Sequence, residues 1–180
     1  MRGIINKGIE ELVLERWGDA AWNEVKRLAG CDEPFFAVSS SYPDETTAAL
    51  IDAASRVSGL PPESVMIEYG KYVVPHSLKR HYPSFFALAG ASPRQFLLNL
   101  NRVHREVTKS IRGARPPFFR IDEAEDGRLQ IEYGSERRLC AVLHGLLLGV
   151  GLALGQELTV RHTECRDRGD PACRFEVLFP

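Results

Sequence analysis

Arg128-Leu-Gln-Ile-Glu-Tyr-Gly-Ser-Glu-Arg137 is the stretch that decides the fold of this chain. Apolar and polar residues alternate in it, as in a β-strand with one buried face. If the strand runs to its last residue, one face carries Leu129, Ile131, Tyr133, Ser135 and Arg137. That face begins apolar and ends in two hydroxyls and a guanidinium. Such a row suits a buried ligand that carries carboxylates, because arginine binds a carboxylate through two hydrogen bonds and hydroxyls satisfy its remaining lone pairs.

The segments on either side of this strand predict helices first and strands later. Helical patterns cover about 4–14, 19–28, 44–58, a stretch from Pro61, a segment at 76–89 broken near Pro83, 92–112 and 139–154. Extended patterns cover about 118–122, 128–137, 157–164 and 173–179. Asp126-Gly127 predicts a hairpin between the first two strands. Helices before strands indicate the α+β class.

The bulk composition excludes several classes of protein. The chain has 180 residues, 23 of them basic and 24 acidic, with a formal net charge of −1. This length fits one domain with a core large enough to enclose a cofactor. The balanced charge favours neither nucleic acid nor a membrane surface as a partner. The first residues lack the apolar core of a signal peptide, and the longest apolar run, 139–154, is too short to span a membrane. We expect a soluble cytoplasmic protein.

A histidine lies on the strongest predicted helix. Ser92-Pro93-Arg94-Gln95 opens that helix with a capping box and a proline in the first turn. The apolar stripe that points His104 inward consists of Phe96, Leu97, Leu100, Val103 and Val107. Such a histidine is more often an ordinary core residue than a ligand. Together with the strand that bears hydroxyls and arginine, however, it suggests haem, with the iron on His104 and the propionates on the strand.

The sequence resembles the haem nitric oxide/oxygen binding (H-NOX) domain, which is related to the haem domain of soluble guanylate cyclase. The resemblance covers essentially the whole chain. The motifs that carry it are Met1-Arg-Gly-Ile-Ile-Asn-Lys-Gly-Ile-Glu-Glu-Leu-Val13, Phe96-Leu-Leu-Asn-Leu-Asn-Arg-Val-His104, Lys109-Ser-Ile-Arg-Gly-Ala-Arg-Pro-Pro117-Phe, and Tyr133-x-Ser135-x-Arg137. It implies a single domain, with a helical subdomain at about 1–60 and a haem-enclosing remainder at about 61–180. Haem would be buried between the helices and an antiparallel four-stranded sheet with an inserted helix.

The resemblance also implies roles for individual residues. His104 would be the proximal ligand of haem b, and Tyr133, Ser135 and Arg137 would hold its propionates. Pro117 would press on the porphyrin and bend it, although the Pro-Pro pair also ends a helix.

Residues on the distal side would select the gas. Oxygen-binding relatives carry a tyrosine at the position of Val142, and the neighbouring distal positions are Ile5, Leu78 and Leu146. Bound O2 needs a hydrogen-bond donor, whereas NO binds ferrous iron strongly without one. We therefore expect a sensor of NO and CO that excludes O2. An inward-turned hydroxyl of Tyr72 or Tyr82 would restore a donor.

The output is expected to pass through another protein. NO would break the bond between iron and His104, and stand-alone bacterial relatives regulate a histidine kinase or a cyclic-di-GMP enzyme, either a diguanylate cyclase or a phosphodiesterase. The sequence shows no pairing of a nucleophile with a base, so we do not expect an enzyme.

Three cysteines and a histidine near the C-terminus form a second candidate site. Cys140, His162, Cys165 and Cys173 match a common ligand set for structural zinc, whereas Cys31 stands apart. By spacing alone, thiols without a metal are as consistent with the sequence as a zinc site. A resemblance to zinc-binding bacterial relatives favours zinc. Because zinc thiolates can be oxidised, a redox sensor that acts through this cluster is the alternative function.

Overall fold

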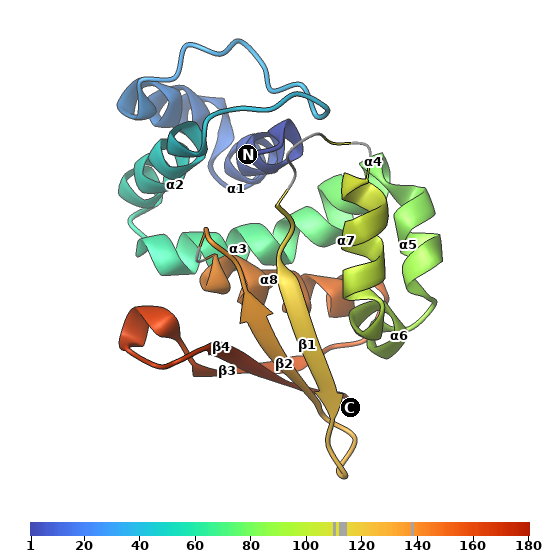
Figure 1. Ribbon diagram of the computed structural model, residues 1–180. Coiled ribbons are helices and arrows are strands. Elements are labelled where there is room, and N and C mark those ends of the chain that lie inside the picture. The colour runs from blue at the N-terminus through green and yellow to red at the C-terminus, as the bar shows by residue number, and fades with distance from the viewer. Residues whose placement is uncertain (110, 112–114, 138) are drawn as a thin grey trace.

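The computed structural model describes residues 1–109, 111, 115–137 and 139–180. Helices α3 and α8 run across the middle of the molecule, with the α1–α2 pair on one side and the sheet on the other (Figure 1). The helices are α1 (Gly3–Ala29), α2 (Asp44–Ser58), α3 (Pro62–Val73), the π-helix η1 (Val74–Leu78), α4 (Lys79–His81), α5 (Pro83–Ala89), α6 (Pro93–Leu98), α7 (Leu100–Thr108), α8 (Cys140–Ala153) and the 3₁₀ turn η2 (Arg166–Arg168).

The sheet has four antiparallel strands in the order β1-β2-β4-β3. The strands are β1 (Phe118–Glu123), β2 (Leu129–Gly134), β3 (Thr159–Glu164) and β4 (Cys173–Leu178). Along β2 and β4 every second residue is buried, so one face of the sheet packs on the helices. The β1–β2 hairpin turns at Asp126-Gly127 as predicted. The α+β prediction is confirmed.

One of the predicted helices is wrong. The two helices expected at 4–14 and 19–28 are present as two helical segments of α1, separated by a kink at Gly18, where φ is 80° and the backbone is not helical. The helix expected at 92–112 is two helices, because Asn99 leaves the helical conformation and its side-chain amide donates to the carbonyls of Ala89 and Gln95. The predicted end of that helix, at 112, lies outside the described residues. Ser92 caps α6 as predicted, since its hydroxyl accepts from the Gln95 N–H.

The backbones of helices α3 and α8 are in contact where the two helices cross. A methyl group added at Gly145 would lie 2.1 Å from the Ile67 carbonyl oxygen and 2.9 Å from the Gly70 Cα. One added at Gly70 would lie 2.5 Å from the Val142 carbonyl oxygen. Glycine is therefore required at both positions, and their small size sets how deeply α8 packs into the molecule.

No helix in the described part of the chain is both long enough and apolar enough to cross a membrane.

This crossing predicts that Gly145→Ala is destabilising. Alanine normally favours a helix by about 1 kcal/mol over glycine, but the clash with Ile67 should lower the free energy of unfolding by about 1–3 kcal/mol. Urea denaturation followed by circular dichroism measures the change. Gly134→Ala is the matched control, because its added methyl meets only the Phe118 carbonyl, at 3.8 Å. A Gly145→Ala variant as stable as the control would contradict the tight crossing.

Candidate functional site

His104 lies on α7 with one of its two ring nitrogens already bound. Nδ1 is 2.8 Å from the carbonyl oxygen of Leu100, and because a carbonyl only accepts, Nδ1 carries the proton. Burial lowers the pKa of His104, so the ring is neutral at pH 7. Its lone pair is then on Nε2, for which no hydrogen-bond partner is found among the described residues. A neutral histidine oriented through its other nitrogen is what an iron or zinc ligand requires.

An aromatic row connects His104 to the sheet. The ring of Phe119, on β1, lies 5.3 Å from the ring of His104 and 5.7 Å from that of Tyr133, on β2. Pro117 is half-buried and comes two residues before Phe119, so it enters the same region. Residues 110 and 112–114, part of the motif that contains Pro117, lie outside the described residues.

The prediction that one strand face continues to Arg137 is wrong for Ser135 and Arg137. Strand β2 ends at Gly134, and the next residues form a turn in which the Ser135 hydroxyl accepts from the Arg137 N–H at 3.2 Å. Burial raises the pKa of Tyr133, while hydrogen bonds with the Ser135 side chain and the Leu139 backbone oppose that rise. The turn therefore brings the hydroxyls of Tyr133 and Ser135 together, and the guanidinium of Arg137 lies beyond the end of the strand.

Arg137 is held by the start of α2, a contact that the sequence did not predict. Its Nε donates to Asp44 at 2.7 Å, and the N-terminal amine of Met1 lies 2.6 Å from the other carboxylate oxygen of Asp44. The hydrogen bond from this amine lowers the pKa of Asp44, and Arg137 contributes to the same shift. Asp44 and Arg137 are 93 residues apart, so no local pattern indicates the pair.

The four predicted distal residues come from three elements that pack together. Ile5 is on α1, Leu78 is at the end of η1, and Val142 and Leu146 are on α8. η1 contacts both α1 and α8, and Val142 is buried while the other three are half-buried. None of the four side chains has a polar atom. π-Helical turns such as η1 are frequently found at functional sites.

Three tyrosines need separate consideration as possible distal donors. The hydroxyl of Tyr72 donates to Glu15 at 2.8 Å and its ring stacks on His76, so it is already used at the α1 interface. The ring of Tyr82 packs on Phe85. Tyr69 was not predicted. It is 2% exposed, and its hydroxyl has no hydrogen-bond partner in the described structure.

The cysteine and histidine cluster is assembled as predicted. The ligand atoms of Cys140, His162, Cys165 and Cys173 all lie within 4.8 Å of one another, and the Sγ atoms of Cys140 and Cys165 are 3.5 Å apart. Tertiary folding brings Cys140 in from the start of α8. These separations suit the edges of a tetrahedral site with bonds of about 2.0–2.3 Å to the metal.

Several features of the cluster fit a bound cation. The Nε2 atom of His162 is buried and has no hydrogen-bond partner among the described residues, and its ring stacks on Phe175 at 4.2 Å. Burial, with the adjacent Cys165 thiol, raises the pKa of Cys140 to about 12. The Arg166 N–H donates to the Cys173 sulfur at 3.5 Å. An uncharged cluster leaves a buried nitrogen unsatisfied, whereas a metal ion would satisfy it and stabilise the thiolates.

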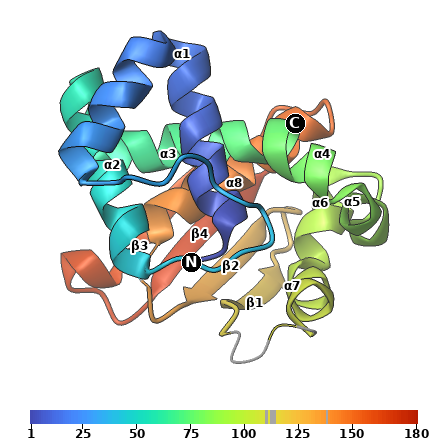
Figure 2. The same cartoon turned by 90° about the horizontal axis from the view of Figure 1, so that it is seen from above.

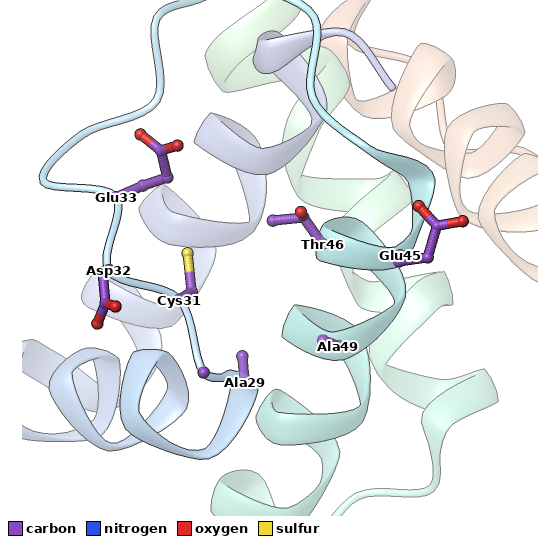
Figure 3. A pocket seen from close by; sticks show the side chains of 8 residues that line it. Ala29, Cys31, Asp32, Glu33, Glu45, Thr46 and Ala49 are labelled. Atoms are coloured by element: carbon purple, nitrogen blue, oxygen red, sulfur yellow. The ribbon is translucent and has the colours of Figure 1, made fainter.

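A surface cavity of about 550 Å³ lies apart from these sites, between the end of α1 and the start of α2 (Figure 3). It is lined by Ala29, Gly30, Cys31, Asp32, Glu33, Glu45, Thr46 and Ala49. It contains none of the predicted site residues, and Cys31 is separate from the three-cysteine cluster, as expected from the sequence.

The fold and these residues define a haem-binding sensor domain. Residues 2–162 match the family model described as haem-NO-binding, and the chain belongs to that family. Soluble guanylate cyclase gcy-32 of Caenorhabditis elegans is 26% identical over 140 residues, which cover 76% of this chain and 20% of the relative. Soluble guanylate cyclase 89Da of Drosophila melanogaster is 21% identical over 137 residues, with coverage of 76% and 20%. This chain therefore spans about a fifth of the length of these relatives.

Solved H-NOX structures share the whole fold. An H-NOX protein from S. oneidensis in the Fe(II)NO state superimposes with a TM-score of 0.90 at 20% identity, covering 100% of this chain and 99% of that one. The I5F mutant of the T. tengcongensis H-NOX gives a TM-score of 0.85 at 22% identity, with coverage of 99% and 97%. The chain has the H-NOX fold, and its family is that of haem-based gas sensors.

The ion pairs of Asp44 predict a pH-dependent contribution to stability. Asp44→Asn should lower the free energy of unfolding at pH 7 by less than about 1 kcal/mol, because half-exposed ion pairs are screened by solvent. The pKa of Asp44 is held below its ordinary value of 3.8, so the stabilisation is complete above pH 3.8. It is lost as the pH falls through the lower pKa of the folded state.

Urea denaturation of the parent and the variant between pH 7 and pH 3 measures this difference, which should shrink toward the acid end. Asp52→Asn, which removes an exposed pair with Arg56 on one helix, is the control. A difference that grows as the pH falls would contradict the assignment.

Proposed function

We propose that this protein senses nitric oxide at a ferrous haem b held by His104, binds CO as well, and excludes O2. The observation that carries the proposal is the neutral His104 ring, whose Nδ1 is bound to Leu100 while Nε2 remains available. Haem supplies the iron that binds the gas. The side chains on this chain orient the haem, keep water out and determine which gas is held.

The distal residues support the exclusion of O2. Bound O2 carries partial negative charge and needs a nearby donor, and Ile5, Leu78, Val142 and Leu146 offer none. The Tyr72 hydroxyl is bound to Glu15. Tyr69 provides a separate test of the proposal, because its hydroxyl is buried and has no hydrogen-bond partner in the described part of the chain.

We propose that the haem propionates are bound by Tyr133, Ser135 and Arg137. The chemistry of this set fits two carboxylates, since it provides two adjacent hydroxyls and an arginine whose side chain is 34% exposed. Arg137 would then contact both the propionates and Asp44. Haem binding could therefore affect the start of α2 through the Arg137 side chain. Pro117 is proposed to press on the haem from the segment before β1.

We propose that His104 would hold the haem iron and that release of its imidazole on NO binding would begin the signal. The helical subdomain, at about 1–60, would then shift relative to the remainder at about 61–180. A switch requires a ligand that stabilises one of two arrangements of the protein. The proposed receiver is a separate bacterial histidine kinase or cyclic-di-GMP enzyme (diguanylate cyclase or phosphodiesterase) in the cytoplasm.

The four-ligand cluster supports a zinc site and, as a second candidate function, a redox sensor. Its three thiols and the unsatisfied His162 nitrogen suit tetrahedral Zn²⁺. Oxidation of two thiolates to a disulfide by a peroxide would release the zinc and bring Cys140 and Cys165, already 3.5 Å apart, into a covalent bond. Control of the partner by thiol oxidation in haem-free protein would favour this second function.

The visible spectrum of the full chain supplied with hemin tests the main proposal. The reduced protein should show a ferrous haem spectrum that forms no oxy complex in air and changes with NO or CO. His104→Gly should lose the haem or change its coordination, because it removes the ligand nitrogen. Exogenous imidazole should restore the parent spectrum.

Two further variants separate the sources of oxygen selectivity. Val142→Tyr should introduce a donor and permit an oxy complex, while Tyr69→Phe should leave the parent spectrum unchanged. A stable oxy complex of the parent that disappears in Tyr69→Phe would overturn the exclusion of O2 and identify Tyr69 as the donor. A parent that takes up no haem would overturn the whole proposal.

The zinc site is tested by metal analysis of the purified protein. The parent should hold about one zinc ion per chain, because all four ligands of a closed tetrahedral site are present. Cys173→Ser and His162→Ala should hold much less and should unfold at lower urea concentration. Cys31→Ser, which changes a cysteine outside the cluster, should keep the zinc of the parent. Equal zinc in all four proteins would refute the assignment.

A further inference from the structure

One side-chain amide joins the His104 helix to the edge of the sheet. β1 is an edge strand, since among the described residues it pairs with β2 alone in the order β1-β2-β4-β3. On its open side, Asn101 of α7 donates through Nδ2 to the Phe119 carbonyl oxygen at 2.6 Å and accepts from the Phe119 N–H at 3.1 Å. A single side chain thus takes the place of a neighbouring strand at this residue and satisfies both backbone groups of Phe119.

The two partners of this contact lie next to the proposed haem site. Asn101 is three residues before His104, so the two side chains lie near one face of α7. The Phe119 ring packs between His104 and Tyr133, at 5.3 and 5.7 Å. Movement of His104 with its helix would therefore pull directly on the strand that follows Pro117.

The helix pair α6–α7 is bound to the sheet at a second point farther from His104. Arg94 donates to the carbonyl oxygen of Gly127 and to Glu123, and its guanidinium lies 4.3 Å from the centre of the Phe179 ring. Arg94 holds the first turn of α6 near the tip of the hairpin, whereas Asn101 holds α7 one turn from the histidine. Of these two hydrogen-bonded contacts, that of Asn101 is closer to His104 along the helices.

We propose that Asn101 is a positioning residue that couples His104 to β1. This inference rests on the proposed function, because it assigns the route by which a displaced His104 reaches the sheet. The amide is required for both hydrogen bonds. A carboxylate in its place would still accept from the Phe119 N–H but would face the Phe119 carbonyl without a proton to donate.

The first test asks whether the contact exists in solution, and it does not depend on haem. Hydrogen exchange of the Phe119 amide, read by NMR in the full chain, should accelerate at least about tenfold in Asn101→Leu, which loses the acceptor. Asn101→Asp, which keeps an acceptor, should remain slower than Asn101→Leu. Asn99→Ala is the matched control, because it loses two side-chain hydrogen bonds to Ala89 and Gln95 but none to the sheet. Unchanged exchange in Asn101→Leu would overturn the inference.

The second test asks whether the contact transmits the release of His104. In haem-loaded protein, hydrogen exchange of 118–123 is measured by mass spectrometry before and after NO is added. The parent and Asn99→Ala should show an NO-dependent change in this segment. Asn101→Leu should lose that change while its visible spectrum still responds to NO, and Asn101→Asp should retain part of it.

The outcomes of the second test separate this inference from the proposed function. A parent that binds NO without any change in β1, or an Asn101→Leu variant with the full change, would overturn the coupling. A parent without haem would overturn the proposed function instead, and the Phe119 exchange would still decide whether Asn101 holds β1.

Discussion

The close crossing of α3 and α8 is the constraint on which the rest of the structure depends. Because Gly70 and Gly145 let the two backbones touch, α8 lies deep in the molecule between the other helices and the sheet (Figure 2). The first residue of α8, Cys140, then reaches the other three ligands of the cluster, which are His162 on β3, Cys165 directly after β3 and Cys173 on β4. Two and six residues later, Val142 and Leu146 enter the proposed distal wall. One packing contact therefore positions parts of both candidate sites.

The two sides of the proposed pocket are attached to different parts of the molecule. On the proximal side, Asn101 and Arg94 bind the α6–α7 pair to the sheet. On the distal side, buried Ser77 of η1 donates to Glu11 of α1, which ties η1 to the N-terminal helices. Arg137 and Asp44 connect the two groups near the proposed propionate site. The signalling proposed above would require these two groups of elements to move relative to one another.

Local patterns predicted the order of the elements, the hairpin and the helical position of His104, because these depend on neighbours a few residues away. They failed where an element ends for non-local reasons. Alternation continues through Ser135 to Arg137, but the strand stops at Gly134 because its partners stop there. Phe118 begins β1 opposite Gly134, and Cys173 begins β4 opposite Tyr133. Beyond that point no neighbouring strand remains to pair with the backbone.

The sequence by itself determined the class of fold, the histidine on an apolar stripe, the hydroxyl and arginine motif, and the ligand types of the metal cluster. The tertiary structure alone decided which of these groups meet. It brought Cys140 to His162, Asp44 to Arg137 and Asn101 to Phe119, and it buried the Tyr69 hydroxyl with no hydrogen-bond partner among the described residues. Residue type and spacing specify what a side chain can bind, but contacts between distant segments depend on how helices and sheet pack, which no local pattern records.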